Sequence, residues 1–286
     1  MPILTNLNGH ISETAQVSVL DRGFLYGDSI YEVVRTFRGR HFGLQEHLDR
    51  LRQSAQYLYM DLPWDDAYIK TEVEKTLAHA EWEDSYIRIV VSRGTESLIS
   101  LQPSRDLQPS LLIILSAIPP QPTLSETGLH LVIPPRLRNS KAALDPAAKT
   151  GNYLNNILAL LEAQQLGADD ALLLNTEGEI TEATTSNLWI VKDGLVLTPP
   201  VEAGILVGIT RRFLWQILED YQIPHAEATL KPADLDTAQE AFLSSSVRLL
   251  MPVRQINETP LPLCPGPVTR KLWDGLLDLM EATAHE

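Results

Sequence analysis

One lysine of this chain stands in a setting that suits covalent chemistry. Most of the seven lysines have polar neighbours typical of a solvated surface, whereas Lys149 follows a run rich in small residues, 142–148, and precedes a helical pattern. Small neighbours let another molecule approach the amine closely, and a lysine amine can form a Schiff base with an aldehyde. An ordinary lysine at a loop–helix junction is the alternative, and the local sequence alone favours that alternative.

Three segments have the residue types of anion sites. Residues 204–211 form a glycine-bracketed loop that enters an apolar-periodic helix, with Thr210 as the expected N-cap, and free N–H groups at such a helix start can bind phosphate. The serines at 244–246 follow a predicted strand and can complete an anion nest. Simple capping and turn formation are the alternatives. Arg50 lies in a helical pattern, where it can clamp a phosphate bidentately or pair with Glu46 four residues earlier.

A carboxylate and an alternating Tyr-Ile-Arg segment complete the candidates. Glu182 is followed by small and polar residues and then by a strand, so it can hold a protonated heteroaromatic nitrogen or serve as a turn acid. Tyr86 and Arg88 alternate on a predicted strand and therefore point to the same face. That face can bind a carboxylate, with an edge or interface arginine as the alternative.

Helices and strands must hold these candidates in place, and the hydrophobic periodicity predicts them along the whole chain. A turn is expected at Asn8-Gly9. The predicted strands cover 3–7, 16–19, 30–37, 86–91, 111–118, 129–133, 171–174, 188–191, 195–197 and 241–244, and the predicted helices cover 44–59, 65–80, 151–166, 210–221 and 267–284. This order is typical of an α+β or mixed α/β class in two lobes.

A proline cluster predicts the boundary between the two lobes. Pro119, Pro120 and Pro122 fall within four residues and cannot continue a strand or a helix. We therefore expect an N-terminal domain at 1–118, a linker at 119–128 and a C-terminal domain at 129–286.

Composition excludes several functional classes. With 23 basic and 37 acidic residues, the net charge of −14 disfavours nucleic acid and anionic membranes as partners. Any anion site must therefore be built locally, against the overall field. Cys264 is the only cysteine and cannot form an internal disulfide, and the N-terminal segment does not resemble a signal peptide. We expect a globular cytoplasmic protein without a metal site.

Taken in order, these segments resemble the class IV aminotransferases, the fold-type IV enzymes of pyridoxal 5'-phosphate, over almost the whole chain. The matching motifs are Asp-Arg-Gly-Phe-Leu-Tyr-Gly-Asp at 21–28, Tyr-Glu-Val-Val-Arg at 31–35, Glu-His-Leu-Asp-Arg-Leu at 46–51, Lys149, residues 152–159, Thr181-Glu182, residues 208–211 and Met-Pro-Val at 251–253. The resemblance implies a small N-terminal α/β domain and a larger C-terminal pseudo-barrel domain that binds the cofactor.

The resemblance also implies a role for each candidate. Lys149 matches the lysine that binds the cofactor covalently and shuttles the proton, and Glu182 matches the carboxylate at the pyridine nitrogen. Tyr153 matches the tyrosine near the 3'-oxygen, and Leu206 matches an apolar residue against the ring. The remaining matches form the phosphate cup: Arg50, the Ile209 and Thr210 amides, the Thr210 hydroxyl and Ser246.

The activity implied is ping-pong transamination between an L-amino acid of branched-chain type and a 2-oxo acid, in branched-chain amino acid biosynthesis. The substrate-binding residues implied are Tyr26, Tyr31, Tyr86, Arg88 and Val247. The Tyr-x-Arg strand at 86–88 resembles branched-chain enzymes, residues 31–34 resemble D-amino acid aminotransferase, and residues 249–253 resemble aminodeoxychorismate lyase, so both relatives remain alternatives.

Two further expectations concern the partner subunit and one departure from the family. The resemblance implies a homodimer with the active site near the interface, where Tyr26 and the 96–102 loop reach the site of the other subunit. Arg248 departs from the usual family sequence and would stand near the substrate carboxylate, either as a new anion contact or as a surface residue.

Overall fold

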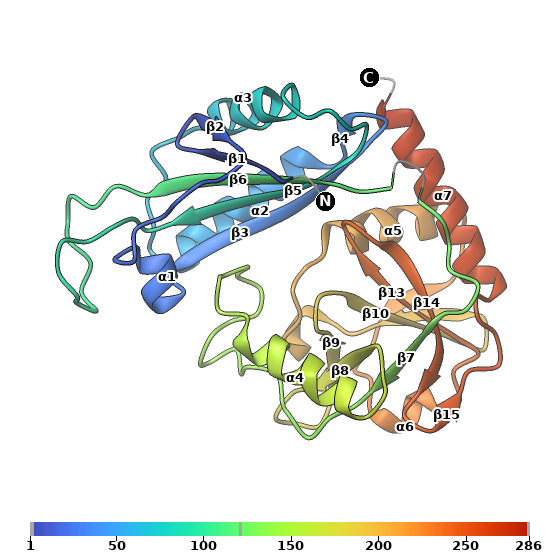
Figure 1. Cartoon of the computed structure of the whole chain (residues 1–286). Helices are drawn as coiled ribbons and strands as arrows, with labels where there is room; N and C mark the ends of the chain where they lie inside the picture. The colour runs from blue at the N-terminus through green and yellow to red at the C-terminus, as the bar shows by residue number, and fades with distance from the viewer. Residues whose placement is uncertain (1–2, 120–121, 285–286) are drawn as a thin grey trace. The chain divides into compact units, whose positions relative to one another are not determined.

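The computed structural model describes residues 3–119 and 122–284 and divides into two compact units (Figure 1). Among the described residues, the first unit contains 3–119, 148–152 and 283–284, and the second contains 122–147 and 153–282. Pro120, one of the three prolines that predict a linker, lies outside the described residues. The segment that carries Lys149 thus belongs to the first unit, although most of the sequence around it belongs to the second.

A six-stranded antiparallel sheet forms the first unit, with strand order β2-β1-β6-β5-β3-β4. Its strands are β1 (Ile3–Leu7), β2 (His10–Ser12), β3 (Ser29–Phe37), β4 (Arg40–His41), β5 (Ser85–Ser92) and β6 (Ser110–Ala117), and its helices are α1 (Arg22–Tyr26), α2 (Leu44–Tyr57) and α3 (Asp66–Leu77).

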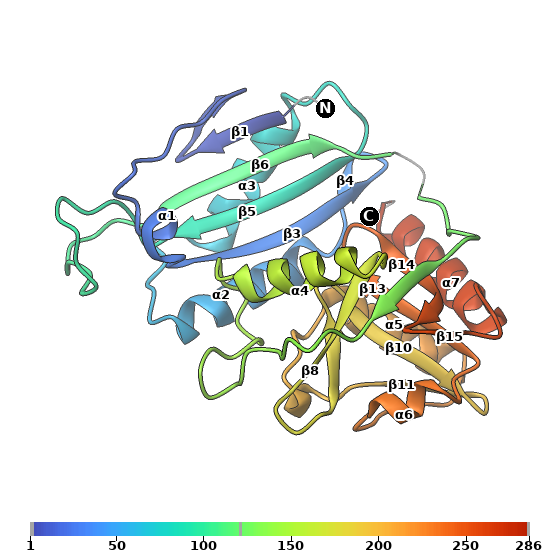
Figure 2. The same ribbon diagram turned by 60° about the horizontal axis from the view of Figure 1, so that its bottom comes forward.

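Helices α2 and α3 cover one face of this sheet, behind β6, β5 and β3 in Figure 2. The side chains of Ile87, Ile89 and Val91 on β5 are fully buried in the core that these helices close. Burial of each such side chain contributes roughly 1.5–3 kcal/mol. Because strand residues alternate between faces, Tyr86 and Arg88 lie on the opposite face of β5, which confirms the predicted alternation.

A curled mixed sheet forms the second unit, with strand order β12-β11-β10-β13-β14-β7-β8-β9 and β15 paired to β14. The strands are β7 (Leu129–Val132), β8 (Asp170–Leu174), β9 (Ile180–Ala183), β10 (Asn187–Lys192), β11 (Leu195–Thr198), β12 (His225–Glu227), β13 (Glu240–Ser245), β14 (Leu249–Ile256) and β15 (Thr259–Pro260). The helices are α4 (Leu154–Gln165), the 3₁₀ turn η1 (Val201–Ala203), α5 (Ile209–Asp220), α6 (Pro232–Leu235) and α7 (Pro267–Ala284).

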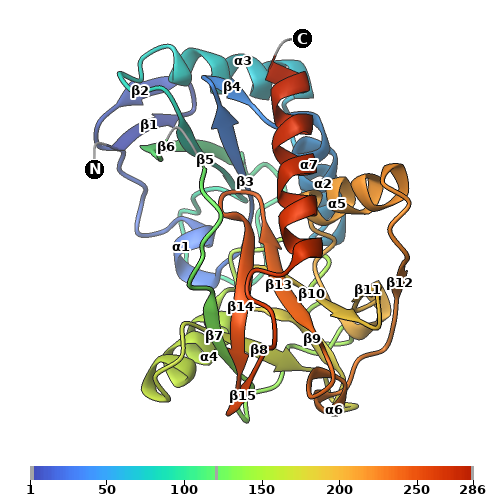
Figure 3. The same cartoon turned by 90° about the vertical axis from the view of Figure 1, so that its right-hand side faces the viewer.

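Helices α5 and α7 pack against each other in this half-barrel unit (Figure 3). The approach is close at Gly275 of α7, where an added Cβ would lie 2.8 Å from the side chain of Ile217 on α5. In the core, the fully buried rings of Trp189 and Phe242 stack with centroids 5.9 Å apart across the β10–β13 pair. Within the described part of the chain, no helix has the length and apolar character needed to cross a membrane.

The predicted strand at 16–19 is wrong. Asn8 and Gly9 both have positive φ and turn the chain sharply, so the residues directly after them pair with β1 and form β2. Residues 16–19 have no strand partner, and Val17 and Val19 are exposed. The alternation of apolar and polar residues at 16–19 therefore belongs to a solvent-exposed segment and not to a strand.

Two predicted helix starts also shift. The helix predicted from residue 151 begins at Leu154, because residues 149–151 pair with β3 instead. The helix predicted from Thr210 begins at Ile209 with Gly208 as the N-cap, so Thr210 is the second helical residue and the expected threonine cap is wrong.

Candidate active site

The backbone of Lys149 extends the sheet of the first unit at the free edge of β3. The Tyr31 amide donates to the Lys149 carbonyl at 3.0 Å, and the Gly151 amide donates to the Ser29 carbonyl at 2.8 Å. The Lys149 amide in turn donates to the Ser54 hydroxyl of α2 at 3.0 Å. A sheet edge and a helix therefore fix the position from which the lysine side chain extends.

Pairing with β3 also sets the direction of that side chain. Ile30 pairs with Thr150, so Lys149 lies opposite Tyr31, and opposite residues of an antiparallel pair project to the same face. The Lys149 Nζ lies 4.5 Å from the centroid of the Tyr31 ring. The Arg88 Cζ lies 3.9 Å from the same centroid. The Tyr31 ring thus contacts both the Lys149 amine, which is the candidate nucleophile, and the Arg88 guanidinium, which is a candidate carboxylate-binding group.

Arg50 pairs with Glu32 of β3, 18 positions earlier in the chain. Its Nε and Nη2 donate to the two Glu32 oxygens at 2.8 and 2.6 Å, and the His47 Nδ1 lies 2.7 Å from Glu32 Oε2. Burial raises the pKa of Glu32, but the Arg50 guanidinium and the His47 ring beside it outweigh burial and lower this pKa to about 2. Burial lowers the pKa of His47, so its neutral ring donates from Nδ1. A buried, ionised carboxylate therefore holds Arg50 in one orientation.

In the second unit, Glu182 lies in β9, so the turn-acid alternative is wrong. Its Oε1 accepts a hydrogen bond from Arg138 Nη2 at 2.5 Å, and its Oε2 accepts from Asn187 Nδ2 at 3.0 Å and from the Leu206 amide at 3.1 Å. The side chains of Glu182 and Arg138 are both buried. An arginine and two further donors keep such a carboxylate ionised, which suits a protonated ring nitrogen.

The start of α5 in the same unit has the features of a phosphate site. Gly208 is the N-cap and makes no side-chain capping bond, and the first-turn amides of Ile209 and Thr210 follow it. A Cβ at Gly208 would lie 2.1 Å from Asn187 Oδ1, so only glycine allows this approach of the chain. Helix N-termini favour bound anions through their N–H groups and their dipole.

A hairpin turn between β13 and β14 carries Ser246 and Val247. Ser245 pairs with Leu249 and closes the turn. Ser244 and Ser245 are the last residues of β13 rather than a loop that follows it. The Ser244 hydroxyl accepts from Trp189 Nε1 at 3.0 Å inside the core, and Ser244 pairs with residues of both neighbouring strands, so Ser244 is not part of an anion nest. Of the predicted serine cluster, Ser246 in the turn keeps its candidate role.

The other candidates lie at the ends of elements. Tyr153 is the half-buried residue at the N-cap of α4, and Leu206 lies half-buried in the loop before α5. Tyr26 ends α1, with the Arg22 Cζ 5.1 Å from its ring centroid. Tyr86 is half-buried on β5, two residues from Arg88.

The residues of the two units fit pyridoxal 5'-phosphate by type. The first unit offers an amine and a buried arginine, and the second offers an uncapped helix start with a glycine approach, a threonine and a serine, and a buried carboxylate. These are the partners that an aldehyde, a phosphate and a pyridine nitrogen require. Among the described residues, no group of three or more His, Cys, Asp or Glu side chains is arranged to hold a metal ion.

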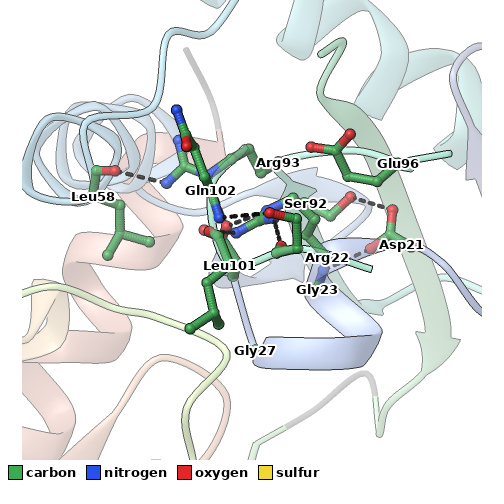
Figure 4. Close-up of polar contacts among 12 residues, drawn as sticks. Asp21, Arg22, Gly23, Gly27, Leu58, Ser92, Arg93, Glu96, Leu101 and Gln102 are labelled. Atoms are coloured by element: carbon green, nitrogen blue, oxygen red, sulfur yellow. Dashed lines mark hydrogen bonds and ion pairs between the residues drawn. The ribbon is translucent and has the colours of Figure 1, made fainter. Parts of the chain in front are cut away.

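The sequence interpretation missed an ion-pair network next to α1. Asp28 Oδ2 accepts from Arg22 Nε at 2.9 Å and from Arg93 Nε at 2.8 Å. Arg22 also donates to the carbonyls of Ser100 and Leu101, and Arg93 donates to the Leu58 carbonyl (Figure 4). The network ties the loop after β5 to α1, and the only sequence signal for it is the motif at 21–28.

The sequence interpretation also missed the groups that hold Glu182. Arg138 is separated from Glu182 by 44 positions along the chain, and Asn156 accepts from Arg138 Nη1 at 3.0 Å. No spacing in the sequence indicates such a pairing, because the fold alone brings these residues together.

Comparison with known proteins adds sequence similarities over most of the chain. The family model for class IV amino-transferases matches residues 29–256. A Methanocaldococcus jannaschii protein named putative branched-chain-amino-acid aminotransferase is 38% identical over 280 residues, which cover 96% of this chain and 95% of that protein. D-alanine aminotransferase of Bacillus licheniformis is 29% identical over 272 residues, 94% of each chain.

Two solved structures share the fold over nearly the whole chain. The branched-chain aminotransferase of the archaeon Thermoproteus uzoniensis, solved with norvaline, has a TM-score of 0.89 and 32% identity, over 97% of this chain and 94% of that chain. The branched-chain amino acid aminotransferase of Thermobaculum terrenum, solved in its PLP-form, has a TM-score of 0.85 and 26% identity, over 97% of this chain and 93% of that chain.

Proposed function

The chain belongs to the class IV aminotransferases, which are pyridoxal 5'-phosphate-dependent enzymes, and on this premise we propose that it transfers an amino group from an L-amino acid of branched-chain type to a 2-oxo acid by a ping-pong mechanism. The observation that carries the proposal is the placement of Lys149 Nζ and Arg88 Cζ on the ring of Tyr31. An amine and a carboxylate-binding cation that contact the same aromatic ring suit an amino-acid substrate.

When bound, the cofactor supplies an aldehyde for the amine and an electron-withdrawing ring that stabilises the carbanion left by proton removal. In the proposal, the Lys149 amine would hold the cofactor at its aldehyde carbon. During turnover, Lys149 Nζ accepts the α-proton of the substrate as a general base and later donates it as a general acid. The Lys149 backbone bonds to Tyr31 and Ser54 keep the origin of this side chain fixed during both steps.

Glu182 holds a proton on the ring nitrogen in this proposal. Its two oxygens accept bonds from Arg138, Asn187 and Leu206, which keep it ionised and oriented. An ionised carboxylate stabilises the protonated nitrogen, which makes the ring a better electron acceptor.

The remaining cofactor contacts are proposed from the side chains and amides described above. Arg50 and Ser246, with the Ile209 and Thr210 amides and the Thr210 hydroxyl, would bind the phosphate. Tyr153 would lie near the 3'-oxygen, and Leu206 would pack against the ring. Five residues are proposed to face the substrate: Tyr26, Tyr31, Tyr86, Arg88 and Val247.

D-amino acid transamination is a second candidate, favoured by the similarity to D-alanine aminotransferase over nearly the whole chain. A half-reaction separates the candidates. The holoenzyme is mixed with L-leucine, L-glutamate or D-alanine, and the absorbance of the covalently bound cofactor is followed. Loss of the band with L-leucine and L-glutamate is expected. Loss with D-alanine alone would overturn the branched-chain proposal, and pyruvate and 4-aminobenzoate formed from aminodeoxychorismate would indicate a lyase.

A homodimer in the cytoplasm is the proposed working form. The loop held by Arg22 exposes the apolar side chains of Leu98, Ile99 and Leu101, each at least 75% exposed, and apolar side chains gathered on a fixed loop are typical of an interface. A single cysteine suits a reducing compartment. Light scattering at the assay concentration tests the dimer, and a fully active monomer would contradict it.

A further inference from the structure

The turn between β13 and β14 contains an arginine that none of the proposed roles uses. Arg248 directly follows Val247, and its side chain is 45% exposed. Its Nη2 lies 3.2 Å from Thr185 Oγ1, 3.4 Å from Ser186 Oγ and 3.7 Å from Asp170 Oδ2. All these contacts lie within the second unit and use one nitrogen of the guanidinium.

The buried Asp170 carboxylate lies near the Arg248 guanidinium but accepts no hydrogen bond from it. Asp170 Oδ1 accepts from the Thr184 hydroxyl at 2.6 Å and from the Ala171 amide at 2.8 Å, so this carboxylate is held by its own neighbours. Its distance of 3.7 Å from Arg248 is too long for a hydrogen bond. Within the part of the chain that the structure describes, no side chain or backbone group accepts a hydrogen bond from Arg248 Nε or Nη1.

Both segments that position Arg248 lead to residues assigned to the cofactor. Ser246 lies two residues before Arg248 in the same turn. Thr185 lies three residues after Glu182, in the segment between β9 and β10. Arg248 is therefore close along the chain to Ser246, and its partner Thr185 is close along the chain to Glu182.

We propose that Arg248 binds a carboxylate of the amino-acid and 2-oxo-acid substrates. This inference rests on the proposed aminotransferase function. Thr185 and Ser186 accept from Nη2 and hold the plane of the guanidinium, so that Nη1 is left to donate to an oxygen of the carboxylate. A hydrogen bond between an arginine and a carboxylate is charge-assisted and therefore stronger than one between neutral groups. Every amino acid and 2-oxo acid substrate carries the required carboxylate.

Non-reacting carboxylates test the proposal directly. The dissociation constants of 4-methylvalerate and glutarate are measured on the holoenzyme by calorimetry, for the wild-type protein, Arg248→Gln and Arg248→Lys. The control is Arg254→Gln, because Arg254 lies on β14, has the same 45% exposure and also pairs with an aspartate, Asp169, at 3.2 Å. Cofactor affinity and the melting temperature are measured for each variant.

We expect Arg248→Gln to raise the dissociation constant of a carboxylate about 10- to 100-fold, which corresponds to the loss of charge-assisted hydrogen bonds. The dissociation constant of Arg248→Lys should lie between those of wild type and Arg248→Gln. The dissociation constant of Arg254→Gln should stay within about twofold of wild type, which is the usual size of the effect of a surface substitution. The cofactor affinity of every variant should also stay within about twofold of wild type. Weaker binding of both acids would identify the carboxylate shared by all substrates, and weaker binding of glutarate alone would identify a distal carboxylate.

Unchanged binding of both acids in Arg248→Gln would overturn the proposal, and so would a loss confined to cofactor affinity. A wild-type protein that binds no cofactor or transfers no amino group would instead overturn the proposed function, so the two failures are distinguishable.

Discussion

The Lys149 Nζ lies 4.5 Å from the centroid of the Tyr31 ring. This contact follows from the backbone, because the pairing of residues 149–151 with β3 sets Lys149 opposite Tyr31. An aromatic face attracts an ammonium group by roughly 0.5–2 kcal/mol, enough to restrict where a flexible lysine side chain lies. The strand edge and the ring together position the amine.

Replacement of Tyr31 tests this positioning. Tyr31→Leu removes the aromatic face and should lower the rate of the half-reaction roughly 2- to 30-fold, the range expected from a cation–π contact. Tyr31→Phe keeps the face and should retain most of the rate. Stopped-flow absorbance with L-leucine measures both, and equal losses in the two variants would assign the effect to the hydroxyl instead of the ring.

Replacement of Glu182 tests the role of the buried carboxylate. Glu182→Gln keeps the shape but not the charge, so a ring nitrogen is no longer held protonated, and kcat should fall roughly 10²- to 10³-fold. The control is Glu177→Gln, at an exposed turn residue. Steady-state kinetics measure kcat, with bound cofactor measured in parallel. A kcat of Glu182→Gln within about threefold of wild type would contradict the role, because that change is too small for the loss of a charge contact.

The low pKa of Glu32 predicts a pH-dependent contribution to stability. The carboxyl titrates near pH 2 in the folded protein against a reference value of 4.5, so its contribution is complete above pH 4.5 and is lost as the pH falls toward 2. A shift of this size corresponds to about 3 kcal/mol. The difference in unfolding free energy between wild type and Glu32→Gln should narrow by that amount from pH 6 to pH 2.

Urea unfolding across this pH range measures the difference, with the exposed Glu81→Gln as the control. A pH-independent difference between wild type and Glu32→Gln would show that the carboxylate charge does not hold His47 and Arg50.

Loss of the Asp28 carboxylate should loosen the loop after β5. Asp28→Asn removes the shared acceptor of Arg22 and Arg93, and an unpaired charge-assisted bond costs about 1–3 kcal/mol. Trypsin cleavage after Arg105, an exposed residue of this loop, should accelerate several-fold because local opening becomes easier. The exposed Asp61→Asn is the control, and an unchanged cleavage rate in Asp28→Asn would show that other contacts hold the loop.

The long elements of the fold were predictable because their periodicity extends over several turns or pairs. Helices α2, α3 and α7 and strands β3, β5 and β6 lie within a few residues of their predicted limits. The elements that were not predicted include α1, β2 and β9, which have five, three and four residues and therefore little periodicity. The segment at 16–19 shows the opposite case, since its alternating pattern has no strand to pair with.

Local geometry at the candidate site was predictable only where one element determines it. The common face of Tyr86 and Arg88 follows from strand alternation alone. The partners of Arg50 and Glu182 were not predictable. Arg50 lies on helix α2 and its partner Glu32 on strand β3, and Arg138 lies in a loop 44 positions before Glu182. Thr210 was misplaced as a cap because Gly208, which can approach Asn187 closely, takes that position.

In the proposed function, the Lys149 amine holds the cofactor. Borohydride reduction of the holoenzyme, followed by digestion and mass spectrometry, locates the attachment. We expect the phosphopyridoxyl mass on the peptide that contains Lys149. In Lys149→Ala, we expect neither that adduct nor turnover. An adduct on a different lysine, or full turnover by Lys149→Ala, would contradict it.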